Sequence, residues 1–207
     1  MLAPLLAMLA LALAPAAPPA PERPSYPPVR WRASVAVGLP DAGRLVRGVR
    51  LPARGPTWFT WDPILHRRPD RPWRRWGTDR LVRIVLHVLR GYHAAHPAAP
   101  PVGVGDLSRP HGGDFGVRFG GPGHLSHQNG LDVDVYYPRR DRKLRAPTAV
   151  SQIAPRLAQD LVDRFVRSGA VRIFVGPHTG LHGPSAIVMP LDHHDNHLHV
   201  RIGPAEG

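Results

Sequence analysis

The sequence predicts one α+β domain with a small, mostly antiparallel sheet flanked by helices. Two segments place apolar residues at helical spacing, and several short segments alternate apolar and polar residues. Pro- and Gly-rich stretches separate these segments. Helices interspersed with short strands and hairpins indicate the α+β class. The length of 207 residues suits a single domain.

The N-terminal region has the features of a signal peptide, which we place at residues 1–20. Residues 2–13 form an apolar run that is followed by small residues, and the run is too short to span a bilayer. No Lys or Arg precedes it. We therefore expect an exported protein with a Pro-rich leader over residues 21–33, a folded domain over residues 34–203 and a tail at 204–207.

The first elements of the domain are expected in this order. Residues 34–51 alternate loosely around a Pro-Asp-Ala-Gly turn, which predicts a small hairpin. Residues 57–76 are rich in Trp and Pro, and we expect an irregular arm whose rings pack on the core. Thr78 is a suitable N-cap for a helix that ends before Pro97. Residues 102–105 indicate a short strand.

The second half of the chain begins with a Gly-rich loop at residues 108–123, whose backbone can approach a ligand closely. Residues 151–168 form a second amphipathic pattern, and Gly169 follows it at a position typical of a helix C-terminus. The remaining strands are expected at residues 131–137, 171–175 and 197–202.

Three residue types are nearly absent, and this restricts the chemistry. There is no Cys, which excludes disulfides, a thiolate nucleophile and Cys-ligated metals. The only Glu residues, Glu22 and Glu206, lie in the tails, so the body has no H-E-x-x-H helix. Lys143 is the only Lys. In contrast, there are 13 His, four of them from His193 to His199.

The net charge is +12, from 27 basic and 15 acidic residues. Either the Arg residues form a solvated surface, or they attract an anionic partner such as nucleic acid, anionic lipid or an acidic wall polymer. No helix-turn-helix, RNP-type or zinc-finger pattern supports nucleic-acid binding. The Arg-rich segment 139–145 is interpreted as a solvated loop, with contact to anionic wall polymers as the alternative.

The first candidate site is the sequence GPGHLSHQNGLDVDVYY. In a strand over residues 131–137, Asp132 and Asp134 point to one face and the intervening Val points to the other. Two adjacent carboxylates repel each other, and a cation is the simplest partner for them. The turn at Gly130 allows His127 to fold back over the strand.

The second candidate site is the sequence LDHHDNHLHVRI. His197 and His199 are two residues apart on a predicted strand, so both rings leave from the same face. Zinc binds neutral imidazole and carboxylate, and three protein ligands leave a position for water. A further His beside the metal can accept a proton from that water. The two motifs together predict a zinc site that includes His127, one of the two aspartates and this pair.

The motifs GDLSRPHGG, GGPGHLSHQNGLDVDVYY and HDNHLHVRI resemble those of the penicillin-insensitive murein endopeptidases. The similarity covers roughly residues 34–202. These enzymes belong to a group of zinc peptidases with the pattern H-x6-D and H-x-H, which includes lysostaphin-type enzymes, D-Ala-D-Ala metallopeptidases and the hedgehog domain. The resemblance implies this fold and a zinc peptidase catalytic domain. The absence of Cys departs from the better-known members, which contain disulfides.

The resemblance also implies roles for individual residues. His127, Asp134 and His199 match the zinc ligands, one ion per chain, and His197 matches the general base. His194 matches a histidine that binds substrate or stabilises charge. A second such residue, His124, precedes the first ligand. The resemblance alone chooses Asp134 over Asp132, since spacing leaves both open.

The implied activity is penicillin-insensitive hydrolysis of D-alanyl–diamino-acid cross-links in peptidoglycan, in the periplasm or cell wall. One alternative is a D,D-carboxypeptidase that releases terminal D-Ala. Another is a catalytically silent wall-binding module that keeps zinc for stability. A basic nucleic-acid binder is the least supported alternative, and we expect no nucleic-acid partner and no membrane span.

Overall fold

A six-stranded sheet lies at the centre of the computed structural model, which describes residues 25–117 and 125–204. The strands, in sheet order, are β4 (Trp58–Thr60), β6 (Val102–Val104), β7 (Asp132–Tyr136), β10 (His197–Ile202), β8 (Ala170–Val175) and β9 (Val188–Pro190). The three inner pairings are antiparallel, and the outermost pairings, β4 with β6 and β8 with β9, are parallel. The expectation of an α+β fold with a mostly antiparallel sheet is confirmed.

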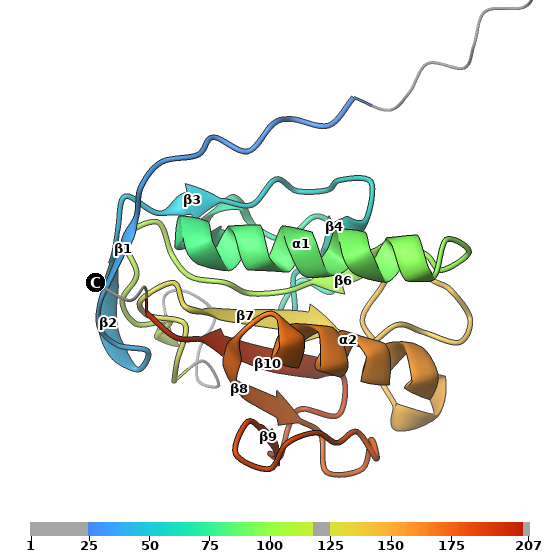
Figure 1. Cartoon of the computed structure of the whole chain (residues 1–207). Helices are drawn as coiled ribbons and strands as arrows, with labels where there is room; N and C mark the ends of the chain where they lie inside the picture. Colours follow the sequence, from blue (N-terminus) through green and yellow to red (C-terminus); the bar gives the residue numbers. More distant parts are fainter. Residues whose placement is uncertain (1–24, 118–124, 205–207) are drawn as a thin grey trace, which may run out of the picture.

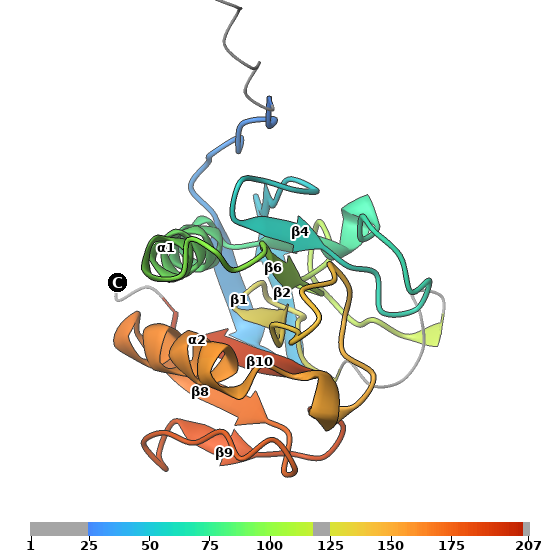
Figure 2. The ribbon, with the colours of Figure 1, turned by 90° about the vertical axis from the view of Figure 1, so that its right-hand side faces the viewer.

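Two helices, α1 (Asp79–Ala95) and α2 (Pro155–Arg167), lie side by side over one face of this sheet (Figures 1 and 2). Their buried apolar residues join those of the central strands in a single core. Strands β7 and β10 contribute four residues with 0% exposure, namely Val133, Val135, Leu198 and Val200. Because side chains alternate along a strand, the residues between these four point to the opposite face.

The helix boundaries follow from local chemistry. Thr78 caps α1 as expected, since its hydroxyl accepts a hydrogen bond from the Leu81 amide at 3.1 Å. The expected start of the second helix at residue 151 is wrong, because a 3₁₀ turn, η3 (Val150–Gln152), comes first and α2 begins at Pro155. Proline suits the first helical position, and it keeps the preceding Ala154 extended. Gly169 adopts the expected positive φ, +85°, after α2.

Two smaller strand pairs pack beside the main sheet. The predicted hairpin is confirmed as β1 (Val35–Leu39) and β2 (Ala42–Val46). A second pair joins β3 (Val49–Arg50) to β5 (Trp76–Gly77), after the 3₁₀ turn η1 (Pro72–Arg74).

The expectation of an irregular arm over residues 57–76 is only partly right. Three of its residues form the edge strand β4, where Trp58 and Phe59 are 8% and 7% exposed. Three residues are too few for an alternating pattern to show in the sequence. Trp58 packs in the core as expected, whereas Trp61, Trp73 and Trp76 are only half-buried.

Neither helix in the described ranges is long and apolar enough to cross a membrane. The predicted signal peptide at 1–20 lies outside the described residues, as do the first part of the leader and most of the tail. The domain boundaries therefore stay predictions.

The cap of α1 is directly testable. Thr78 is 4% exposed, and its hydroxyl also donates to the Gly130 carbonyl at 3.2 Å, which ties α1 to the turn before β7. We expect Thr78→Ala to lower the free energy of unfolding by about 1–2 kcal/mol, since a cap and a buried hydrogen bond are lost. Thr78→Ser keeps the hydroxyl and should retain most of that stability. Urea unfolding measures the free energy of unfolding of both variants. Equal losses in the two variants would contradict this role of the hydroxyl.

Candidate active site

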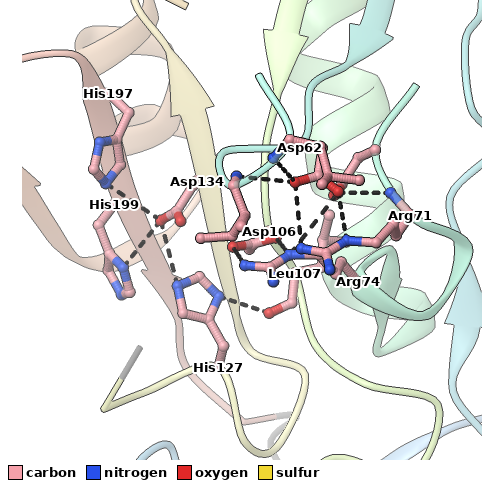
Figure 3. Close-up of polar contacts among 12 residues, drawn as sticks. Asp62, Arg71, Arg74, Asp106, Leu107, His127, Asp134, His197 and His199 are labelled. Atoms are coloured by element: carbon pink, nitrogen blue, oxygen red, sulfur yellow. Dashed lines mark hydrogen bonds and ion pairs between the residues drawn. The ribbon is translucent and has the colours of Figure 1, made fainter. Parts of the chain in front are cut away.

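The antiparallel register of β7 and β10 assembles the candidate site. His199 lies opposite Asp134, and Arg201 lies opposite Asp132. Alternation therefore turns both carboxylates and the side chains of His197 and His199 to the face away from the core. The expected grouping of these residues on one face is confirmed, and Figure 3 shows Asp134, His197 and His199 together.

His127 reaches this face from the loop that precedes β7. It has a left-handed backbone with φ 68°, and Gly130 has φ +78°, so the chain reverses sharply before the strand. The His127 Nδ1–H donates to the Leu107 carbonyl at 2.6 Å. Since a carbonyl can only accept, this bond sets the tautomer and leaves Nε2 directed at Asp134, 3.3 Å from its Oδ1 (Figure 3).

Two imidazole rings converge on a single carboxylate oxygen. Asp134 Oδ1 lies 3.3 Å from His127 Nε2 and 3.2 Å from His199 Nδ1, and one ligand atom from each residue lies within 4.8 Å of the others. All three residues are buried, with exposures of 1–6%. Within the described ranges this oxygen makes no well-directed hydrogen bond. A buried, under-satisfied carboxylate oxygen beside two imidazole nitrogens is a donor set that fits a zinc ion.

Asp132 has partners that remove it from this donor set. Its Oδ1 accepts hydrogen bonds from the Arg201 Nε–H at 2.7 Å and from the His199 Nε2–H at 2.9 Å. The second bond leaves Nδ1 as the free nitrogen of His199, on the side of Asp134. The structure therefore separates two aspartates that strand periodicity leaves equivalent. Arg201 is not among the sequence-predicted site residues, although its spacing of two from His199 places it on the same face.

The two aspartates favour positive charge on the groups that they contact. Burial opposes ionisation of Asp134, but the nearby His127 and His197 outweigh it and hold the pKa of Asp134 well below its usual range. Burial also opposes charge on His199, yet its contacts with Asp132 and Asp134 raise its pKa to about 9. A bound cation would meet the same electrostatic demand.

His197 has the properties of a proton acceptor. Its Nδ1–H donates to the Asn196 side-chain oxygen at 2.6 Å, which leaves Nε2 as the acceptor, 3.7 Å from Asp134 Oδ1. Burial lowers the pKa of His197 to about 4, so the ring is neutral near pH 7. The His194 ring lies beside it, with ring centroids 4.7 Å apart, and donates its Nδ1–H to the Asp192 carbonyl at 2.8 Å.

These residues lie at a pocket of about 520 Å³ on the surface of the protein. The structure brings five of the six sequence-predicted site residues to it: His127, Asp134, His194, His197 and His199. The sixth, His124, lies outside the described residues. Ser126, Tyr136, Phe174 and Asn196 also line the pocket. Sequence reasoning did not assign a site role to any of these four.

A buried ion pair supports the site from behind. Arg74 is 0% exposed and contacts the Asp106 carboxylate through both Nε and Nη2 (Figure 3). The main chain next to this pair holds the site: the Asp134 amide donates to the Asp106 carbonyl at 2.9 Å, and the Leu107 amide donates to the Arg74 carbonyl at 2.9 Å. The carbonyl of Leu107 orients His127.

The fold and the site define an α+β protein with a buried His–Asp–His centre at a surface pocket, able to hold a metal ion. The family model of the penicillin-insensitive murein endopeptidases matches residues 36–169, and the chain belongs to this family. This match ends before β10, so His194, His197 and His199 are located at the site by the structure.

A relative named penicillin-insensitive murein endopeptidase, from Yersinia enterocolitica, is 31% identical to this chain over 129 residues. The match covers 48% of this chain and 44% of the Yersinia protein. The chain therefore matches less than half of the length of that relative.

The buried ion pair gives a stability prediction. Asp106→Asn removes the carboxylate that contacts the buried Arg74 guanidinium through two nitrogens, and we expect the free energy of unfolding to fall by about 3–5 kcal/mol. Asp163→Asn makes the same chemical change on the partly exposed face of α2 and should cost about 0.5 kcal/mol or less. Equal losses in urea unfolding for the two variants would refute a special role for the pair.

Proposed function

We propose that this chain is a zinc-dependent endopeptidase that hydrolyses D-alanyl–diamino-acid cross-links between the stem peptides of peptidoglycan and is insensitive to penicillin. The observation that carries the proposal is the convergence of His127 and His199 on the buried Asp134 Oδ1. Membership of the murein endopeptidase family supports the substrate class. The predicted signal peptide supports action in the periplasm or cell wall.

His127, Asp134 and His199 would hold the ion. Zinc bound there would act as a Lewis acid that polarises the scissile carbonyl and lowers the pKa of a water toward about 7. The contacts of Leu107 with His127 and of Asp132 with His199 fix both rings, so each presents one nitrogen to the centre.

In this proposal, His197 moves the proton. Its Nε2 accepts a proton from the attacking water, whose oxygen bonds to the scissile carbonyl carbon. The carbon–nitrogen bond then breaks, and His197 passes the proton to the leaving amine. Water attacks directly, so no acyl-enzyme on Ser forms, and β-lactams, which acylate such Ser residues, would not inhibit the enzyme.

Two further histidines would contact the substrate. His194 lies beside His197 in the pocket and would bind the substrate or stabilise developing charge. The resemblance to the family implies the same role for His124. The pocket volume of about 520 Å³ is large enough for a short peptide segment.

The reaction is tested on purified cross-linked peptidoglycan fragments, with and without a chelator, with products read by mass. We expect loss of cross-linked dimers, no free D-Ala, and activity that the chelator removes and zinc restores. Release of free D-Ala would instead establish the carboxypeptidase. One bound zinc per chain without any turnover would establish a silent wall-binding module.

Two variants separate the proton acceptor from a metal ligand. His197→Ala should lower kcat by about 10²–10⁴-fold and keep one zinc per chain, because only proton transfer is lost. His199→Ala should lose both zinc and activity. His87→Ala, at an exposed position on α1, is the matched control and should change neither. Zinc content is measured by mass spectrometry, and normal turnover by His197→Ala would exclude it as the base.

A further inference from the structure

A second pocket, of about 570 Å³, lies where the N-terminal segment passes the β3–β5 pair. Four arginines line it, Arg30 and Arg32 from the N-terminal segment, Arg50 from β3, and Arg75 beside β5. The uncharged Trp76 also lines the pocket, and the other lining residues are Pro and Ala. No carboxylate lines the pocket, so four positive charges share one concave surface.

Arg75 is the most unusual of the four, because it is buried. Arg75 is only 6% exposed, and its Nη1–H donates to the Leu51 carbonyl at 2.9 Å. Its Nε is buried and has no hydrogen-bond partner among the described residues, and no described carboxylate lies within ion-pair distance of this guanidinium. A buried cation without a counter-charge is costly, so this position calls for an anion.

Asp70 is the acidic group nearest in sequence to Arg75, but its described ion pair is with Arg74, whose Nε lies 3.9 Å from Asp70 Oδ1. Burial and the proximity of Asp106 also raise the pKa of Asp70. Arg74 pairs with Asp106 as well. No described carboxylate therefore forms an ion pair with the arginines of the second pocket.

Two of the exposed arginines, Arg32 and Arg50, lie against one aromatic ring. Arg50 lies opposite Trp76 in the β3–β5 pair, and its guanidinium carbon is 5.8 Å from the ring centroid. The guanidinium carbon of Arg32 is 5.7 Å from the same centroid. Cation–π contacts restrict both side chains without using their N–H donors, which stay available for a ligand.

We propose that this second pocket binds phosphate groups. Guanidinium forks match phosphate oxygens in pairs, and a phosphate group can carry two charges, so it neutralises several arginines more fully than one carboxylate can. The group can belong to a small soluble phosphate or to a phosphate-bearing wall polymer. The assignment of the phosphate group to a wall polymer rests on the proposed function, whereas phosphate binding itself does not.

The test measures the binding of inorganic phosphate and of a poly(glycerol phosphate) chain to the full-length protein by titration calorimetry. The double variant Arg32→Gln and Arg50→Gln removes two exposed pocket charges. We expect it to weaken phosphate binding by about tenfold or more. Arg90→Gln with Arg156→Gln removes the same charge from exposed helix positions and should change phosphate binding by about twofold at most.

The outcomes are distinguishable. A loss of both ligands in the pocket variant alone supports a polymer-binding pocket, and a loss of inorganic phosphate alone supports a site for a small phosphate. Equal weakening in the two double variants, or no phosphate binding by the unaltered protein, overturns the proposal. If the pocket bound a DNA oligonucleotide more tightly than the wall polymer, and the pocket variant lost this binding, the assignment of the phosphate to a wall polymer would be overturned.

A further measurement separates this site from the candidate active site. Both double variants should cleave soluble cross-linked peptidoglycan fragments at the rate of the unaltered protein, because none of the four arginines lines the active-site pocket. Failure of the peptidase assay in all proteins would count against the proposed function and leave the phosphate result to stand by itself. Unchanged circular dichroism spectra would show that the variants are folded.

Discussion

The register between β7 and β10 is the constraint on which the candidate site depends. Pairing His199 with Asp134 places the metal-ligand candidates on one face, and Val133 and Val200 on the other. A slip of one residue would bury the charged groups in the core and expose the valines. The two faces therefore support each other, since burial of the valines selects the only register in which the donor atoms meet.

A buried ion pair supports the candidate site from outside these two strands. The Arg74–Asp106 pair is buried, and in such surroundings hydrogen bonds are strong and an unpaired partner is costly. The main chain beside it accepts the Asp134 amide and orients His127 through Leu107. One buried ion pair thus supports two of the three candidate ligands, although it contacts neither of their side chains in the described hydrogen bonds.

Sequence reasoning succeeded where a pattern is local. Alternation over residues 131–137 and 197–202 was enough to place four polar side chains on one face, and the cap at Thr78 was enough to start α1. It failed where the deciding contact is distant in sequence. Strand β9 has only three residues, and the choice between the two aspartates depends on a contact between Asp132 and Arg201, 69 residues apart.

Most of the positive charge lies at the surface. Among the described residues only three arginines are buried, Arg74, Arg75 and Arg139, whereas the sequence carries 27 basic residues and a net charge of +12. Such a field attracts any polyanion, but it is screened over about 8 Å at physiological ionic strength. The second pocket adds fixed geometry to this field. Long-range charge mainly raises the rate of encounter, whereas a pocket of oriented guanidinium groups lengthens the time that a bound phosphate stays. Under the proposed function, retention on an insoluble wall depends on the second property more than on the first.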